Sequence, residues 1–503
     1  MRFEPAWVAA AVLCLTASCL KFDPFTCSED AQCNLGSQIG YCQDSGFCAY
    51  PDFGCPSGLR YGDDAGGGLG GTCVVEPTDT EASDGSSTTE GSTGSDTSAL
   101  DDTSSSGPTS DETGDACGGP GEPCCGGDQC DDGLACAGTA CGCALEVTAG
   151  QRHSCAIKVD GTVWCWGAND LAQVRTPAGA AELVPVSVGD SFGAAGKALT
   201  LSSRNHTCAL RDDALAICWG ANAAGQSDPT EPADGVDPRA ASWAQSATTV
   251  GVGLSHTCVG RSAGLVASCW GSNAQAQLSG ELEGPGPVDI GGALVFAQVE
   301  LGDVHTCGRT EFGEVWCWGD NAHGQLGEDP ALLPSSTGLH PVQLPAVDEI
   351  ALGARHSCAR AGDEVWCWGR NDFGQLGDGT GTLQFVPVAI ALPAAGLSVQ
   401  SLTSGPDHTC VITTDGALWC WGSNASGQLM LEPDQTGDDS RTLVPVEIEV
   451  GAGVLSFAGG ASHSCALVET GALVCWGTNV HGQIGTGDQF FAFEPRAVEL
   501  ACP

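Results

Sequence analysis

Seven histidines in the C-terminal part of the chain share one local pattern whose residue types could bind a metal or form covalent cross-links. Each histidine is followed by serine or threonine and then by cysteine, and a second cysteine comes nine to eleven residues after the first. Imidazole and thiolate are the usual ligands of zinc in proteins, whereas two cysteines can instead form a disulfide. These histidines are His153, His206, His256, His305, His356, His408 and His463.

The spacing of the paired cysteines favours disulfides across β-hairpins. Directly opposite residues of an antiparallel pair have Cβ atoms close enough for an S–S bond. Cys155 and Cys165 centre on Asp160, which predicts a three-residue loop, and the shorter interval in the fifth pair predicts the two-residue loop Gly362-Asp363. The predicted bridges are Cys155 with Cys165, Cys208 with Cys218, Cys258 with Cys269, Cys307 with Cys317, Cys358 with Cys367, Cys410 with Cys420, and Cys465 with Cys475.

The histidines and one set of tryptophans are expected to be structural. We expect each histidine to hydrogen-bond within its own unit, because equivalent positions of separate units lie too far apart to share one ion. No metal and no cofactor is therefore predicted. Large aromatic side chains dominate the packing of such cores. We expect that role for Trp166, Trp219, Trp270, Trp318, Trp368, Trp421 and Trp476.

A second tryptophan occurs in only four of the units. Irregular positions in a repeat are where a scaffold carries function, since the regular ones serve the fold. We therefore predict a possible binding face that includes Trp164, Trp316, Trp366 and Trp419. Three acidic insertions, residues 228–246, 328–338 and 432–442, are expected to be solvated turns, because the Asp-x-Asp-x-Asp-Gly pattern of a calcium loop is missing from them.

The elements that position these residues are short strands in a repeat of about fifty residues. The intervals between the seven histidines lie between 49 and 55 residues, and such a period indicates stacked or radially arranged units. In the fourth unit we expect strands at 299–302, 305–308, 314–319 and 340–344. Seven units of four strands without a helical period predict an all-β fold, a seven-bladed β-propeller over residues 144–503.

The repeat resembles that of the RCC1 family. The residues that carry the resemblance are the histidine before the second strand, an Asp-Gly turn, Trp-Gly-x-Asn and Gly-Gln-Leu-Gly; the fifth unit, Cys367 to Gly379, matches most fully. The resemblance implies a seven-bladed propeller. The paired cysteines depart from the intracellular members of the family and fit an exported one.

Closure of such a ring would bring its two ends together. Cys143 directly precedes the first unit and Cys502 directly follows the last. We therefore predict a disulfide between Cys143 and Cys502, with Cys141 as the alternative partner.

The N-terminus indicates export. Arg2 precedes an apolar run from Trp7 to Leu15, and small residues lead to Cys19, so residues 1–18 are expected to be a signal peptide. The stretch before Cys19 resembles a bacterial lipobox, although Thr16 stands where leucine is usual. Lipidation of Cys19 is the leading interpretation, and an ordinary cleaved signal is the alternative.

Two cysteine-rich modules and a linker are predicted between the signal and the propeller. Residues 19–75 and 117–143 are rich in cysteine, glycine and aspartate and are expected to be small disulfide-rich modules. Residues 76–116 contain 19 serines or threonines, 11 acidic residues and no aromatic residue, so they are expected to form a disordered linker. Thirty cysteines in one chain favour an oxidising compartment.

Charge and motifs narrow the function. The formal net charge is −45, with 62 acidic and 17 basic residues, which disfavours nucleic acid as a partner. No catalytic residue is predicted, because the common hydrolase, metalloprotease and phosphate-binding motifs are missing from the sequence. The export signal and the cysteines argue against the guanine-nucleotide exchange for which the RCC1 family is known.

The leading hypothesis is therefore an exported, lipid-anchored monomer of the cell envelope or outer surface, or a secreted one, that binds an unidentified protein or glycan. Membrane contact is expected only through the lipid anchor. The alternatives are an exported propeller lyase or hydrolase, and a secreted inhibitor of the β-lactamase-inhibitor type, which looks like the same seven-bladed family.

Overall fold

The computed structural model describes residues 140–500 apart from residue 190, residue 235 and the ranges 193–195, 231–232, 262–266, 281–286, 291–293, 394–396 and 432–439. It also describes four short segments before residue 140. These are β1 (Tyr41–Cys42), β2 (Cys48–Pro51) and β3 (Leu59–Tyr61), which form one antiparallel sheet, and β4 (Ala135–Ala137), which pairs with β5 (Ala140–Gly142). The predicted signal peptide, Cys19 and the linker lie outside the described residues, as does most of both cysteine-rich modules. Their assignments stay predictions.

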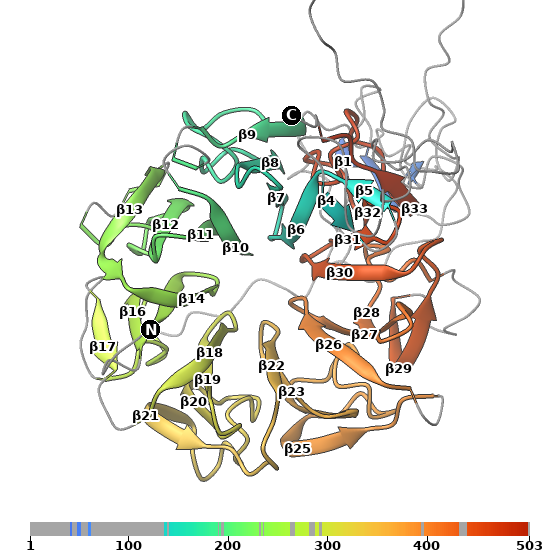
Figure 1. Cartoon of the computed structure of the whole chain (residues 1–503). Coiled ribbons are helices and arrows are strands. Elements are labelled where there is room, and N and C mark those ends of the chain that lie inside the picture. Colours follow the sequence, from blue (N-terminus) through green and yellow to red (C-terminus); the bar gives the residue numbers. More distant parts are fainter. Residues whose placement is uncertain are drawn as a thin grey trace, which may run out of the picture. The chain divides into compact units, whose positions relative to one another are not determined.

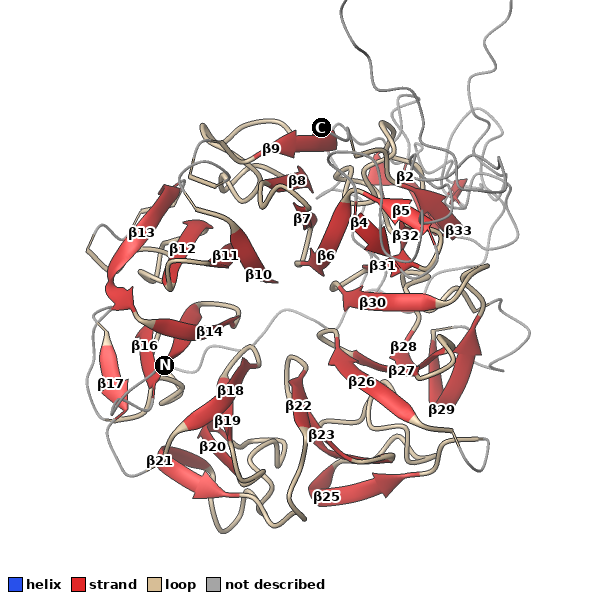
Figure 2. Ribbon diagram, viewed as in Figure 1, coloured by secondary structure: helices blue, strands red, loops and turns tan. Residues whose placement is uncertain are grey.

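From Ala144 onward the described chain forms seven antiparallel sheets of four strands, each built from consecutive strands (Figures 1 and 2). Blade 1 contains β6 (Ala144–Ala149), β7 (His153–Lys158), β8 (Val163–Gly167) and β9 (Glu182–Ser187). Blade 2 contains β10 (Ala198–Ser203), β11 (His206–Arg211), β12 (Leu215–Gly220) and β13 (Val236–Gln245). Blade 3 contains β14 (Ala247–Val252), β15 (His256–Arg261), β16 (Ala267–Gly271) and β17 (Val288–Ile290).

The remaining blades repeat this arrangement. Blade 4 contains β18 (Phe296–Leu301), β19 (His305–Thr310), β20 (Val315–Asp320) and β21 (Ser335–Pro341). Blade 5 contains β22 (Glu349–Leu352), β23 (His356–Ala361), β24 (Glu364–Gly369) and β25 (Gln384–Ile390). Blade 6 contains β26 (Val399–Ser404), β27 (His408–Thr413), β28 (Leu418–Ser423) and β29 (Arg441–Ile448). Blade 7 contains β30 (Val454–Gly459), β31 (His463–Val468), β32 (Leu473–Gly477) and β33 (Ala492–Ala497).

The blades surround one axis, and the first strand of each blade is the innermost (Figure 1). The seven-bladed β-propeller predicted from the repeat is confirmed. No helix long and apolar enough to span a membrane occurs in the described part of the chain.

The hairpins have the predicted register. Cys155 lies opposite Cys165, and Lys158 and Thr162 close the loop 159–161, in which Gly161 has a φ of 80°. In blade 5, Ala361 pairs with Glu364 around the predicted two-residue loop, whose Gly362 has a φ of 60°. Each of the seven predicted hairpin disulfides is present, with Cα atoms 4.0 to 4.1 Å apart.

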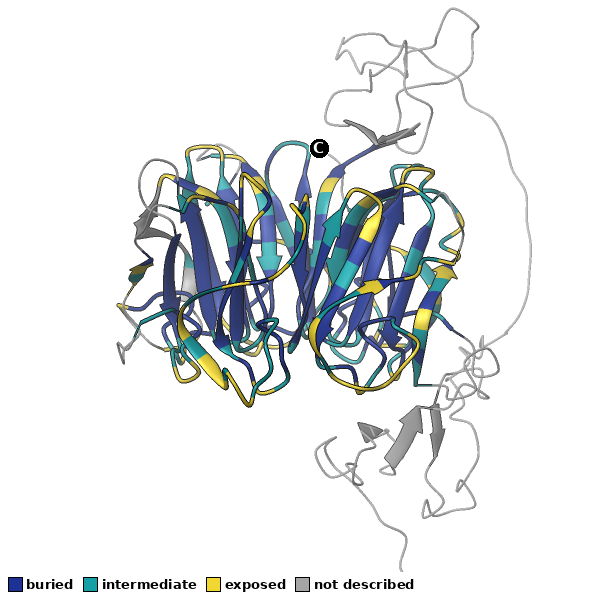
Figure 3. Ribbon diagram, turned by 90° about the horizontal axis from the view of Figure 1, so that it is seen from below, coloured by how far each residue is buried: buried dark blue, intermediate teal, exposed yellow. Residues whose placement is uncertain are grey.

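The core lies between the blades, not within a single layer (Figure 3). The side chain of Trp166, on blade 1, packs among buried residues of blade 7, while Cys155 and Cys165 pack with residues of blade 2. Each blade therefore presents its third-strand tryptophan to the preceding blade and its disulfide to the following one. All seven tryptophans predicted to be core residues are completely buried.

The fourth strands were the least well predicted elements. In blade 4 the expected strand 340–344 is β21, which begins five residues earlier at Ser335, and in blade 2 most of the expected loop 228–246 is β13. Both are outer strands, and the pairing of each with the third strand contains register shifts. The side chains of β21 alternate little between buried and exposed, so the sequence lacks the two-residue apolar period from which strands are recognised.

The ring closes without exchange of strands between its first and last blades, since β6–β9 and β30–β33 are each continuous in sequence. Side-chain and backbone hydrogen bonds join blade 7 to blade 1 instead, among them Ala461 N to Gly150 O at 3.2 Å and Gly487 N to Leu183 O at 2.9 Å. A covalent bond between the two ends would therefore add a constraint that the strands themselves do not supply.

We predict that this bond joins Cys143 to Cys502. Cys143 is disulfide-bonded, and its Sγ lies 3.8 Å from the carbonyl oxygen of Leu500, two residues before Cys502. Cys502 itself lies outside the described residues. A non-reduced proteolytic digest should contain one cross-linked peptide that carries both cysteines, and mass spectrometry of the same digest after reduction should separate them. A peptide that links Cys502 to another cysteine, or that carries it as a free thiol, would refute the pairing.

Candidate functional site

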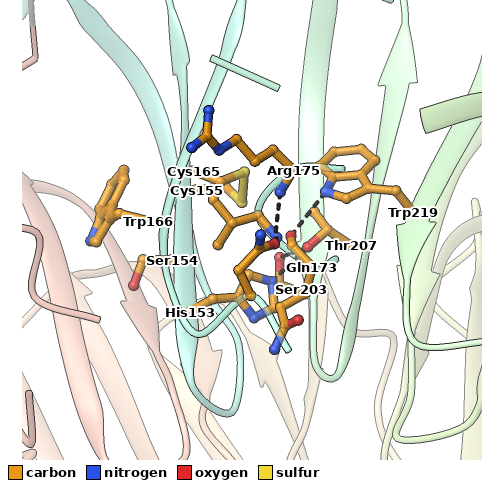
Figure 4. Close-up of a disulfide and its surroundings, with 12 residues drawn as sticks. His153, Ser154, Cys155, Cys165, Trp166, Gln173, Arg175, Ser203, Thr207 and Trp219 are labelled. Carbon is orange, nitrogen blue, oxygen red and sulfur yellow. Dashed lines mark hydrogen bonds between the residues drawn. A yellow bond between two sulfur atoms is a disulfide. The ribbon is translucent and has the colours of Figure 1, made fainter. Parts of the chain in front are cut away.

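The polar residues that recur in each repeat unit meet at the interfaces between blades. At the interface of blades 1 and 2, His153 Nε2 lies 2.6 Å from the hydroxyl of Thr207, and Trp219 Nε1 donates to the carbonyl oxygen of Gln173 at 2.9 Å (Figure 4). The tryptophan-to-glutamine bond occurs at all seven interfaces, with lengths of 2.8 to 3.0 Å. The repeated residues therefore lock each blade to the next.

The partners of the histidines correct the sequence prediction. We expected each histidine to hydrogen-bond within its own blade, but six of the seven bond through Nε2 to the serine or threonine hydroxyl of the following blade, at 2.6 to 3.0 Å. Sequence periodicity gives the position of a residue within its unit but not which neighbouring unit it faces. The pattern of histidine followed by serine or threonine is therefore one half of a joint between two blades.

The hydroxyl at this joint explains why the position is serine or threonine. Thr257 donates its hydroxyl hydrogen to the carbonyl oxygen of Gln226 at 2.7 Å, so it must accept a hydrogen from His206. His206 is therefore the neutral tautomer with hydrogen on Nε2. Its Nδ1 is buried without a hydrogen-bond partner. A residue without a hydroxyl could not accept from one neighbour and donate to the other.

The corner after the third strand places the glutamine carbonyl. In blade 4 the side-chain oxygen of Asn321 accepts from Leu326 N at 2.8 Å, and that of Gln325 accepts from His323 N at 2.9 Å. Equivalent asparagine and glutamine bonds recur in the other blades. The Trp-Gly-x-Asn and Gly-Gln-Leu-Gly motifs thus form one rigid turn that presents an acceptor to the next blade.

The seven histidines are buried in a way that keeps them neutral. Burial lowers the pKa of each imidazole from its usual value to about 3, with smaller contributions from neighbouring positive charges. Within the described residues no group of three or more histidine, cysteine or acidic side chains is arranged to hold a metal ion. Six of these seven histidines form structural joints between blades.

Blades 6 and 7 meet differently from the other pairs. Neither ring nitrogen of His408 has a hydrogen-bond partner, and the hydroxyl of Ser464 bonds only to the carbonyl oxygen of Gln428 at 2.9 Å. The ring of Phe457 packs edge-on against His408, with 6.4 Å between the centroids, where the other blades carry valine, leucine or isoleucine. This interface therefore has one polar joint fewer.

This difference provides a matched pair of substitutions. Ser154→Ala removes a hydroxyl bonded to His463 Nε2 at 2.7 Å and to the carbonyl oxygen of Gln483 at 3.0 Å, whereas Ser464→Ala removes only the bond to Gln428. We expect Ser154→Ala to lower the free energy of unfolding by about 1–3 kcal/mol more than Ser464→Ala, because it leaves a buried donor unsatisfied. Urea denaturation of the two variants measures the difference. Equal losses would show that the histidine joint contributes nothing to stability.

The four irregular tryptophans are spread over four different blades. Trp164, Trp316, Trp366 and Trp419 are half-buried on the third strands of four different blades. Trp316 packs against the cluster of blade 3 and Trp419 against that of blade 5. The indole nitrogens of Trp316, Trp366 and Trp419 are buried without a hydrogen-bond partner, so only the carbon edges of these rings could meet a ligand. The ammonium of Lys158 lies over Trp164, 4.8 Å from its ring centroid. A shared binding face for the four rings stays a prediction.

Aspartates in the acidic insertions cap backbone groups where the structure describes them. Asp234 Oδ1 accepts from Asn222 N and Ala223 N at 2.6 and 2.9 Å, and Asp228 Oδ1 accepts from Thr230 N at 2.9 Å. Residues 432–439 of the third insertion lie outside the described residues. The described aspartates thus cap turns, but the prediction of solvated turns was wrong for the stretches that form β13 and the start of β21, and Asp228 itself is buried.

A cavity of about 240 Å³ lies on the propeller axis, between the inner strands. Two of its lining residues are charged, Arg204 from the turn after β10 and Glu300 from β18. Sequence reasoning missed both, because the first strands of blades 2 and 4 are about a hundred residues apart and meet only when the ring closes. One signal was present: six units carry glycine three residues before the histidine, whereas blade 2 has Ser203, directly before Arg204.

The chain is similar to known proteins over the propeller. A family model described as "RCC1-like domain" matches residues 229–502, and one for the regulator of chromosome condensation (RCC1) repeat matches residues 145–173. The ultraviolet-B receptor UVR8 of Arabidopsis thaliana is 28% identical over 330 residues, covering 61% of this chain and 73% of the receptor. Human protein RCC2 is 40% identical over 97 residues, 19% of this chain and 18% of its own length. The crystal structure of Prp20p from Saccharomyces cerevisiae matches with 21% identity and a TM-score of 0.46, over 71% of this chain and 77% of that one.

Proposed function

Because the chain belongs to the RCC1-like domain family, we propose that it is an exported binding protein whose propeller presents a rigid, acidic surface to a basic protein partner. The single observation that carries this proposal is a closed ring in which a buried disulfide stabilises every blade. Disulfides of this kind persist in oxidising compartments and are rare in the cytosol. A lipid anchor at Cys19 belongs to the same proposal and would tether the protein to the cell envelope.

The charge of the propeller supports a basic partner. From Ala144 onward the sequence contains 39 acidic and 14 basic residues, so the excess of negative charge does not depend on the predicted linker. Several of the arginines are already engaged with acidic side chains, such as Arg360 with Glu349 and Arg152 with Asp170. A surface that carries mostly negative charge attracts positively charged partners and raises the rate at which they associate.

The rigidity of the propeller favours binding over catalysis. Binding costs conformational entropy when loops must be ordered, and a surface fixed by disulfides and interlocked blades avoids much of that loss. Of the repeated histidines, the polar residues that could do chemistry, six are used in joints between blades and all seven are buried. A lyase or hydrolase would need acids and bases at a substrate cleft outside those joints.

Affinity capture from the native cell envelope tests the proposal. The mature, oxidised chain is immobilised, incubated with envelope extract at each salt concentration, and only then cross-linked and analysed by quantitative mass spectrometry. We expect a basic protein at a stoichiometric level, and the complex should weaken when the salt concentration rises from about 50 to about 500 mM, because the attraction is screened. The reduced and alkylated chain is the control for nonspecific binding.

Two outcomes would contradict the proposal. Recovery of the same proteins by the reduced and alkylated control would show that the folded propeller is not what binds. Turnover of an envelope glycan by the purified chain, without a stoichiometric protein partner, would favour the enzyme alternative.

A further inference from the structure

The axial cavity is polar and is lined by residues of all seven blades. Serine and threonine side chains from β6, β10 and β26 line it, together with the two charged residues. Its volume of about 240 Å³ is many times the roughly 10–15 Å³ that a single water molecule needs. It can therefore hold a small polar molecule of comparable size.

Arg204 is the cationic group of the cavity. The side chain is buried, with 5% of its surface exposed, and its Nη2 reaches across the axis to the carbonyl oxygen of Leu352 in blade 5 at 3.4 Å. That single long bond leaves most of the five guanidinium N–H donors for other acceptors. No carboxylate of the described residues forms an ion pair with Arg204. A buried guanidinium in this state is stabilised by an anionic group placed against it.

Glu300 is the anionic group of the cavity. Its carboxylate accepts one hydrogen bond, from the amide of Gln298 at 3.2 Å. The pKa of Glu300 is raised to about 7, chiefly by burial and to a smaller extent by nearby Glu349, against the opposing effects of the Gln298 hydrogen bond and of Arg204. The hydroxyl of Ser404, also on the cavity wall, is buried without a hydrogen-bond partner. The cavity therefore contains the guanidinium of Arg204 with most of its N–H donors unused, the carboxyl group of Glu300, and the hydroxyl of Ser404 without a hydrogen-bond partner.

We propose that the axial cavity binds a small zwitterion of the α-amino acid class, with its carboxylate at Arg204 and its ammonium at Glu300. A simple anion is disfavoured because Asp407, which interacts electrostatically with both Arg204 and Asp303, adds negative charge near Arg204. A simple cation is disfavoured by Arg204 itself. A ligand that carries both charges can pair with both Arg204 and Glu300. A polar side chain on this ligand would contact the serine and threonine hydroxyls of the cavity. This site is separate from the protein-binding surface proposed above.

Three ligands that differ by one group test the assignment on the full-length protein. The probes are L-serine, L-serinamide, in which a neutral amide replaces the carboxylate, and L-glycerate, in which a hydroxyl replaces the ammonium. Isothermal titration calorimetry should show saturable binding of serine at millimolar or lower concentration. Each of the other two should bind at least about tenfold more weakly, since each leaves one buried charge unpaired. Equal binding of all three, or none by serine, would overturn the proposal.

Two substitutions assign the ends of the ligand. Arg204→Gln should reduce serine affinity by about tenfold or more and should remove the preference for serine over serinamide. Glu300→Gln should instead remove the preference for serine over glycerate. Asp363→Asn, in the loop of the β23–β24 hairpin, is the matched control and should leave serine binding unchanged. If a variant misfolds, the comparison of the three ligands on the unmodified protein still tests the proposal. Retention of both preferences in folded Arg204→Gln and Glu300→Gln variants would also overturn the proposal.

Discussion

The propeller should unfold in mild acid, and its stability should begin to fall as the pH drops below about 6.5, the usual pKa of histidine. The reason is the set of seven buried imidazoles, whose pKa in the folded protein is lowered to about 3. Between these two values the unfolded chain binds protons that the folded chain does not. Stability is therefore complete above the unfolded pKa and is lost progressively as the pH falls toward the folded pKa.

The number of histidines makes the effect large. Seven groups titrating only in the unfolded chain remove about 10 kcal/mol between pH 7 and pH 5.5, which is comparable to the whole stability of a typical domain. Glu300 acts in the opposite direction, because its raised pKa gives the folded state one proton more in part of this range. The raised pKa values of Glu146, Glu349 and Asp407 act in the same direction as that of Glu300, so the net dependence is smaller than that of seven protons.

Denaturant unfolding at a series of pH values measures this dependence. The midpoint should fall steeply between pH 7 and pH 5, and His206→Gln should reduce the slope by about one seventh, since one titrating group is removed. His340→Gln, on outer strand β21, is the control for replacing a histidine outside the buried set of seven. A midpoint that stays constant over this range would mean that the folded protein takes up the same protons, which is incompatible with histidines held neutral by burial.

The parts of the fold that the sequence predicted correctly depend on residues close together in the chain. The interval between Cys155 and Cys165 determines both the register of the hairpin and the length of its loop, and the structure has both as predicted. The seven blades follow from the period of the same motif. These features need no knowledge of which blade faces which, because each hairpin contains all the information about its own geometry.

The parts that were missed depend on contacts between blades. His153 was assigned to its own blade, but its partner Thr207 is 54 residues further on. Arg204 and Glu300 meet on the axis only because seven units close into a ring. The outer strands were predicted poorly for a different reason. Strands such as β21 are partly or fully exposed and have no clear period of apolar residues. Local pattern thus determined the hairpins and the number of blades, and closure of the ring determined the polar joints and the cavity.

The propeller should also depend on its disulfides to the point that the reduced chain does not refold. Each of the seven bridges closes a short hairpin, with cysteines nine to eleven residues apart. In the chain-entropy model a loop of this size contributes about 3 kcal/mol, so seven together contribute roughly 20 kcal/mol. That sum exceeds the stability of about 5–15 kcal/mol that folded domains usually retain.

The same bridges should resist reductant as long as the protein is folded. Their sulfur-bearing side chains are at most 1% exposed, so a thiol or phosphine cannot reach them without unfolding. We expect none of these fourteen cysteines to be alkylated after treatment of the native protein with reductant, and all of them after treatment in denaturant. Mass mapping of the alkylated peptides distinguishes them from the cysteines of the N-terminal modules.

The decisive step is refolding from denaturant. Chain that is denatured without reductant should recover its β-sheet circular dichroism and its resistance to protease, whereas chain that is denatured, reduced and alkylated should recover neither. A double variant, Cys358→Ala with Cys367→Ala, provides the intermediate case and should fold with a free energy of unfolding lower by about 3 kcal/mol. Recovery of the native state by the fully reduced chain would show that the bridges form on a fold that is already stable. The strongest physical reason for placing this propeller outside the cytosol would then be lost, since a reducing compartment would no longer prevent its folding.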